Sequence, residues 1–178
     1  MNIFYLDESP RICAQYHNDK HCVKMILEYC QLLSTAHRVL DGTEYYDKTA
    51  NGRRIKRWRL DDAREDVIYK ATHINHPSAV WARETKANYL WLHKLLVELL
   101  AEYTYRYGRD HACGKLVEPL SHVPVNIEDA DFTPPTPAMP DEYKVNNAIE
   151  SYHNYYRGAK RGMANWKNRS VPYFMNWG

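Results

Sequence analysis

Five polar side chains recur at helical spacing within one apolar stretch near the start of the chain, and this pattern constrains the fold most. They are His17, His21, Lys24, Glu28 and Gln31. At about 100° per residue, these positions lie within roughly 80° of one another on a helix. The remaining circumference is apolar, with Cys22, Val23, Met25, Ile26, Leu27, Cys30, Leu32 and Leu33. Ionisable groups on a largely buried helix are costly to desolvate unless they pair or meet a ligand, so the stripe predicts the wall of a site.

The rest of the chain predicts a mostly α-helical fold, a compact bundle in one domain over residues 1–178, with two long central helices and a long proline-rich loop. Ser9-Pro10 is a typical helix start, Asn18-Asp19 a candidate break and Gly108 a typical helix end. The expected elements are an extended or strand-like lead-in over 1–6, helices at about 10–40, 60–72, 77–107 and 142–165, a basic loop over 43–57 and the proline-rich loop over 114–141.

The four cysteines have no metal-ribbon spacing, and no apolar run is long enough to span a membrane, so we expect a cytoplasmic protein without a membrane partner. We expect neither a cofactor nor a bound metal. The i,i+4 pair His17 and His21 could ligate an ion, although the glutamate of an H-E-x-x-H motif is missing and Lys24 is close. A metal-dependent nucleotide hydrolase using these two histidines with His73 and His76 is therefore one alternative.

Within the stripe, Glu28 is the candidate general acid, general base or charge stabiliser, and Lys24 one turn away assists it. His17 and His21 are candidate proton carriers or phosphate contacts, and Gln31 a candidate substrate contact. A solvated face of i,i+4 ion pairs is the alternative interpretation.

A second cluster, residues 72–78, places His73 and His76 at the start of a predicted helix, where backbone N–H groups favour anions. Arg83 lies one to two turns further on, so these three residues are candidate substrate contacts and a second wall of the site. A helix cap around one buried histidine is the alternative.

Basic and aromatic residues interleave in two further segments, which favours nucleic-acid binding through phosphates and stacked bases. The candidate contacts are Arg53, Arg54, Lys56 and Arg57 in the first segment, and Tyr155, Tyr156, Arg157 and Lys160 in the second. Glycines of the second segment would allow close approach to a phosphate. Tyrosines packed inward beside solvated arginines are the alternative.

Three spaced motifs, in this order, resemble the phage pyrimidine-dimer DNA glycosylase family, endonuclease V. They are Asp19-x-His21 with Glu28, Leu92-x-Lys94 with Glu98 to Glu102, and Tyr152-x-x-Tyr155-Tyr156-x-Gly158-x-Lys160. The chain is also similar to uncharacterised phage proteins that begin M-N-[IV]-F. The resemblance implies a helical DNA-binding domain that extrudes a nucleotide, with Glu28 as the catalytic carboxylate, and a host-cell cytoplasmic location.

In that family the α-amine of a small first residue attacks the sugar C1′ after methionine is removed. Here Asn2 follows Met1, so we expect the methionine to stay and its amine to lie displaced, with Lys24 as a substitute amine. A glycosylase/AP-lyase acting on a pyrimidine nucleotide is the first expectation. The alternatives are a thymine-modifying transferase on the same scaffold, the metal-dependent hydrolase, and a non-catalytic nucleic-acid-binding module.

Overall fold

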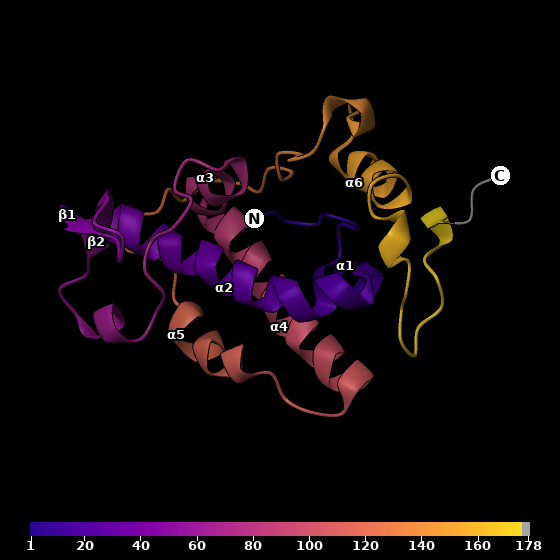
Figure 1. Ribbon diagram of the computed structural model, residues 1–178, viewed down its shortest axis with the longest axis horizontal. Helices are drawn as coiled ribbons and strands as arrows, with labels where there is room; N and C mark the ends of the chain where they lie inside the picture. The colour runs from indigo at the N-terminus through magenta and orange to yellow at the C-terminus, as the bar shows by residue number, and fades with distance from the viewer. Residues whose placement is uncertain (176–178) are drawn as a thin grey trace.

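The longest helix, α2 (Asp19–Asp41), carries the polar stripe and packs against the second-longest, α4 (Lys86–Tyr107). The computed structural model describes residues 1–175, and within them the protein is compact and mostly α-helical, as predicted (Figure 1). The other elements are α1 (Pro10–Tyr16), β1 (Thr43–Lys48), β2 (Arg54–Arg59), α3 (Pro77–Glu84), α5 (Val117–Leu120) and α6 (Ala148–Arg157). None of the helices in the described part of the chain combines the length and apolarity that a membrane span needs.

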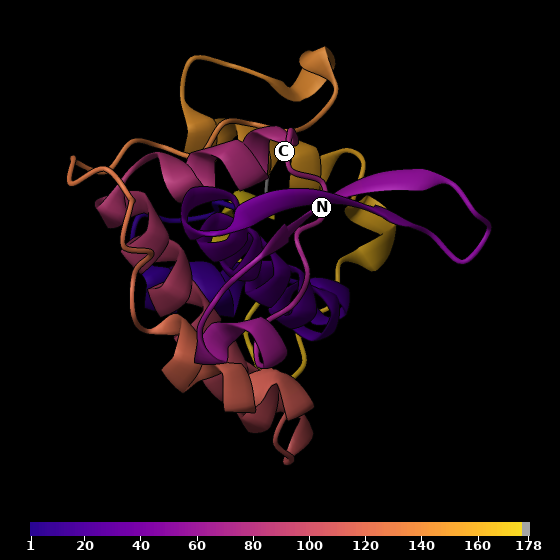
Figure 2. The same cartoon turned by 90° about the vertical axis from the view of Figure 1, so that its left-hand side faces the viewer.

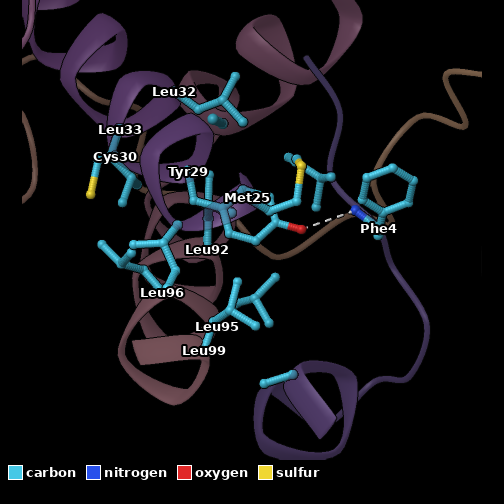
Figure 3. Packing of buried hydrophobic residues seen from close by; sticks show 14 of the residues in the cluster. Phe4, Met25, Tyr29, Cys30, Leu32, Leu33, Leu92, Leu95, Leu96 and Leu99 are labelled. Atoms are coloured by element: carbon cyan, nitrogen blue, oxygen red, sulfur yellow. Dashed lines mark hydrogen bonds between the residues drawn. The ribbon is translucent and has the colours of Figure 1, made fainter. Parts of the chain in front are cut away.

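The core forms where α2 crosses α4, and Figure 3 shows the side chains that fill this contact. From α2 come Met25, Tyr29, Leu32 and Leu33, and from α4 come Leu92, Leu95, Leu96 and Leu99, all essentially inaccessible to solvent. Each buried leucine contributes about 1.5–3 kcal/mol of burial free energy. α3 packs against both long helices and α1 against α4, so the polar stripe is held on a rigid scaffold.

Helix starts follow side-chain caps that are visible in the sequence. Asn18 caps α2 by accepting a hydrogen bond from the His21 amide, which confirms the expected break between α1 and α2. Thr85 caps α4 in the same way and divides the expected helix over 77–107 into α3 and α4. Gly108, with φ of 67°, ends α4 as predicted.

The expected loop over 43–57 is wrong, because these residues form an antiparallel hairpin in which Thr43 pairs with Arg59 and Lys48 with Arg54. The signals were present: β-branched and aromatic residues flank Asn51-Gly52, and Gly52 has the positive φ of 81° that such turns require. A run of arginines and lysines hid this pattern.

The expected helix over 60–72 is also wrong, and only a 3₁₀ turn, Ala63–Asp66, forms there. The guanidinium of buried Arg38 explains this. It donates hydrogen bonds to the carbonyls of Glu65, Ile68 and Tyr69, and a helix over 60–72 would have used the first two internally.

Two other boundaries differ from the prediction. The helix expected over about 142–165 is shorter at both ends, since α6 runs from Ala148 to Arg157, and a short helix, α5, lies inside the expected proline-rich loop. The lead-in is extended, as expected, and Ile3, Phe4, Tyr5 and Leu6 are buried in the core.

Candidate active site

The N-terminal segment, α2 and the end of α6 enclose a cavity of about 230 Å³. Its lining residues are Met1, Asn2, Phe4, His21, Lys24, Met25, Glu28, Ala138, Tyr155 and Lys160. Three positions of the predicted stripe, His21, Lys24 and Glu28, therefore face one hollow. Two positions of the C-terminal basic–aromatic segment, Tyr155 and Lys160, close it from the other side.

Glu28 is the centre of the cavity's charge pattern. Its Oε1 lies 3.3 Å from the α-amine nitrogen of Met1, and its Oε2 lies 3.7 Å from Lys24 Nζ. The expectation that the Met1 amine would lie displaced from the site is wrong, because this amine and the carboxylate form an ion pair at the cavity wall. Lys24 is mostly exposed, whereas the Glu28 side chain is only 13% exposed.

One oxygen of the Glu28 carboxylate lacks a hydrogen-bond donor. Oε2 of Glu28 is buried and accepts no hydrogen bond from any group within residues 1–175, since Lys24 Nζ is beyond hydrogen-bond distance. Buried polar atoms in native proteins are nearly always satisfied, so an unsatisfied carboxylate oxygen beside a cavity favours a ligand that brings a donor.

Cationic groups outnumber carboxylates around the hollow. Of its lining groups in the described residues, the Met1 amine, Lys24 and Lys160 are cationic, and Glu28 is the one carboxylate. Lys160 Nζ lies 5.0 Å above the Tyr155 ring, which holds it at the rim. This balance favours an anionic guest.

Aromatic rings form the floor of the cavity. The Phe4 ring stacks on the imidazole of His21 with centroids 3.9 Å apart, and lies nearly parallel to Tyr155 at 6.4 Å. Phe4 is only 4% exposed, so the half-buried Tyr155 ring is the member of this stack that can contact a planar base.

His21 is held neutral. The Tyr156 hydroxyl accepts a hydrogen bond from the Asn18 amide and lies 2.7 Å from His21 Nδ1. Within residues 1–175 this nitrogen is the one acceptor within its reach, so the buried hydroxyl donates to Nδ1 and the ring proton lies on Nε2. Burial, and then the basic groups nearby, lower the pKa of His21 to about 2. His21 can therefore donate a hydrogen bond to a guest but does not present a positive charge at neutral pH.

The expectation that His17 lines the site is corrected. Its ring is 0% exposed, Nδ1 donates to the Cys13 carbonyl and Nε2 accepts from the Tyr29 hydroxyl, both at 2.7 Å. The helix break at Asn18 takes His17 off the α2 stripe and into the core. Its lowered pKa, about 4, is caused first by burial.

The apolar arc of α2 is narrower than predicted, because Val23 and Leu27 are 42% and 39% exposed. Gln31, one turn beyond Glu28, is half-buried but does not line the cavity.

A second cavity, of about 520 Å³, lies between β2 and residues 71–76. It is lined by Ile55, Lys56, Arg57, Trp58, Ala71, Thr72, His73, Ile74, Asn75 and His76. The expected second wall therefore exists for His73 and His76, but around a separate hollow. His76 of the second cavity interacts electrostatically with groups of the first. Burial and then the charge of the Met1 amine lower the pKa of His76, while Glu28 raises it.

The expected anion site at the start of α3 is otherwise a helix cap. His76 Nδ1 accepts a hydrogen bond from the Ser78 amide, which confirms the helix cap of the alternative interpretation, but neither His73 nor His76 is buried as that alternative expected. Arg83 lines neither cavity. Its Nη1 is buried without an acceptor in the described residues, and burial lowers its pKa.

The C-terminal candidates separate into two groups. Tyr155 and Lys160 line the cavity, whereas Tyr156 is 1% exposed and cannot stack on a base. Arg157 donates to the Phe174 carbonyl and to Asn154, and so braces the end of α6. Gly158 does not face a phosphate, because a Cβ there would lie 2.3 Å from the Tyr143 ring.

Sequence reasoning missed Asn2 and Phe4. The Asn2 side chain donates to the Ala138 carbonyl at 2.8 Å and accepts from the Tyr152 hydroxyl at 2.7 Å. These bonds fix the position of the Met1 amine. The available signal was an apolar lead-in interrupted by one amide side chain, but nothing local connects it with residues 138 and 152.

Within residues 1–175, no group of three or more histidine, cysteine or acidic side chains is arranged to hold a metal ion. Comparisons with family models, curated proteins and solved structures found no match to this chain.

Proposed function

We propose that the protein is a DNA-acting enzyme of the glycosylase/AP-lyase type, whose cavity receives one pyrimidine nucleotide extruded from the duplex. The observation that carries the proposal is the 3.3 Å approach of the Met1 α-amine to the partly buried Glu28. Attack of an amine on a sugar requires an amine nucleophile and a nearby carboxylate that can transfer its proton. Both groups lie in this hollow, together with cationic and aromatic side chains. The ordered motifs that resemble endonuclease V point to the same chemistry.

The proposed reaction begins when the unprotonated amine attacks C1′ of the extruded nucleotide. The glycosidic C1′–N bond breaks, and its electron pair leaves with the base, which then gains a proton. The C1′–O4′ bond opens to give an iminium between the amine and the sugar. Glu28 takes the proton that the amine loses and returns it to O4′. Loss of a C2′ proton from the iminium then breaks the C3′–O bond, the 3′-phosphate leaves with that electron pair, and water hydrolyses the iminium.

The other lining groups bind and orient the nucleotide. Lys24 and Lys160 neutralise the flanking phosphates, and the half-buried Tyr155 provides a ring face near the extruded residue. A nucleotide that fills this hollow of about 230 Å³ must first leave the base stack of the duplex.

Borohydride reduction tests the proposal, because it converts an iminium into a stable protein–DNA bond. We expect a trapped complex on abasic or pyrimidine-dimer duplex DNA. Glu28→Gln should lower the trapping rate by about 100-fold or more, since general acid–base groups contribute about 10²–10⁴-fold. The control is Glu118→Gln, whose carboxylate is 85% exposed on α5 and should leave the rate unchanged.

Peptide mapping of the trapped complex identifies the amine. We expect the adduct on the first residue, with the intact mass giving its identity, and Lys24→Arg should still trap. An adduct on Lys24 would transfer the nucleophile to that residue. If no adduct forms under any condition but DNA binding persists, the Schiff-base reaction is wrong and base modification on the same scaffold becomes the better proposal.

A further inference from the structure

We infer that the β1–β2 hairpin, residues 43–59, is an arm that binds the major groove of duplex DNA beside the nucleotide held in the cavity. This inference rests on the proposed function for its partner, DNA, and adds the surface that holds the duplex.

The first observation is the distribution of charge. Residues 43–59 contain six lysines and arginines and two acidic residues, a net charge of +4, whereas the whole chain carries +2. The rest of the protein is therefore net negative, at −2. Residues 157–169 form a second cationic segment, with five lysines and arginines and no acidic residue, so the arm is one of two segments to which long-range attraction draws a polyanion.

The second observation is shape. Figure 2 shows the hairpin projecting from the side of the helical body as a free two-stranded ribbon. Its side chains are mostly exposed on both faces, including Tyr46, which is 54% exposed. A two-stranded ribbon has the dimensions that the B-DNA major groove, about 12 Å wide, admits.

The third observation is that the base of the arm is fixed. Arg38, 2% exposed in α2, donates a hydrogen bond to the Trp58 carbonyl, and Arg57 donates to the Ala71 carbonyl. Gly42 joins α2 to β1, and a Cβ there would lie 2.5 Å from the Arg38 carbonyl oxygen. A ribbon anchored in this way presents its cations in a defined direction.

Several cations on the arm are also held in place by their neighbours. The guanidinium of Arg54 lies 3.7 Å over the Tyr46 ring, and that of Arg59 lies 4.6 Å over Tyr45. Guanidinium groups already held by a neighbouring ring lose less conformational entropy when they bind phosphates or guanine edges.

The arm is connected to the reaction cavity. Its inner face, with Ile55 and Arg57, forms one side of the second cavity, and His76 forms part of the other side. α3 begins directly after His76 and packs against α2, the helix that carries Lys24 and Glu28. This contact joins the base of the arm to the helix that lines the reaction cavity.

Fluorescence anisotropy with a DNA duplex at several salt concentrations tests the arm. The arm variant is Lys48→Gln with Arg53→Gln, two exposed cations flanking the turn. The matched control is Lys94→Gln with Lys115→Gln, two exposed cations on α4 and before α5. Both variants lower the net charge by two, and thermal unfolding confirms that both remain folded.

We expect the arm variant to bind about tenfold or more weakly at 0.1 M salt and to lower the slope of log K against log salt by about 2. The control should change neither value appreciably. Dimethyl sulfate modification of guanine N7, which lies in the major groove, should interfere with binding of the wild type.

The inference is wrong if both variants weaken binding alike, if the arm variant loses as much affinity for single strands as for duplex, or if guanine N7 modification has no effect. Trapping separates this failure from that of the proposed function. If adducts form but binding does not depend on the arm, the proposed enzyme activity stands and the arm inference is wrong. If binding depends on the arm but no adducts form, the arm inference stands and the proposed activity is wrong.

Discussion

Two histidines four residues apart, His17 and His21, share a residue type but have different roles because their surroundings differ. His21 lies on α2 and lines the cavity, whereas His17 lies in the gap before α2 and is fully enclosed. The His17 ring forms hydrogen bonds with the Cys13 carbonyl and the Tyr29 hydroxyl. That hydroxyl also accepts a hydrogen bond from the Phe4 amide. His17 thus supports the segment that carries the Met1 amine without contacting a ligand.

This burial predicts a stability loss in mild acid. The pKa of His17 falls from 6.5 to about 4 on folding, so between these values the unfolded chain binds a proton that the folded protein excludes. The contribution of His17 to the free energy of unfolding is therefore fully present above about pH 6.5 and decreases as the pH falls toward 4. Between pH 7.5 and 5.0 the contribution of His17 is about 2 kcal/mol.

Urea unfolding at these two pH values measures the effect. His17→Gln should be less stable at pH 7.5 than the wild type, but its further loss at pH 5.0 should be smaller by about 2 kcal/mol. His122→Gln, a change at a side chain that is 78% exposed, should keep the wild-type loss. Equal losses in wild type and His17→Gln would contradict the assignment.

The element that closes the cavity is the end of α6, and its position depends on one close contact. Gly158 follows α6, and its Cα faces the Tyr143 ring, whose centroid lies 5.4 Å from that of Tyr155. Tyr155 in turn lines the cavity. The glycine is therefore required for packing, since its φ of −88° is open to any residue.

Gly158→Ala should displace Tyr143 and disturb Tyr155. We expect a loss of about 1–3 kcal/mol in the free energy of unfolding, typical of overpacking, together with weaker trapping on abasic DNA. Gly162→Ala is the matched control, because nothing lies within 4 Å of a Cβ at that position. It should change stability by less than about 0.5 kcal/mol. Similar effects of the two substitutions would show that Tyr143 yields freely.

At the scale of the whole molecule, a buried ionic network joins distant parts of the chain. Arg106 on α4 is 0% exposed and bonds Glu102 at 2.7 Å and Asp19, at the start of α2, at 3.0 Å. Arg169 of the C-terminal segment also bonds Glu102, at 2.9 Å. The network thus fixes α2 and the C-terminal segment relative to α4, and with them both sides of the cavity.

Arg106→Gln should leave Asp19 without its cation and the buried Glu102 with Arg169 alone. We expect a loss of about 3–5 kcal/mol in the free energy of unfolding, the usual cost of removing one partner of a buried pair. Lys94→Gln, an exposed change on the same helix, should be nearly neutral. Chemical denaturation of both variants measures the difference, and a loss below about 1 kcal/mol for Arg106→Gln would contradict the role of the network.

Periodicity in the sequence predicted much of the scaffold and part of the candidate site. It placed His21, Lys24 and Glu28 on one face of a helix, and side-chain caps marked the start of α2 and the end of α4. These features depend on neighbours within about four residues, so local sequence is sufficient to reveal them.

Tertiary contacts decided the rest. Arg38 forms hydrogen bonds with carbonyls of the 60–72 segment, which prevents the helix expected there. Asn2 forms hydrogen bonds with residues 138 and 152, which hold the Met1 amine beside Glu28. By itself the sequence determined which side chains share a helical face. Only the folded chain decided which of them meet a cavity and which are enclosed in the core, because that depends on hydrogen bonds and packing between residues far apart in sequence.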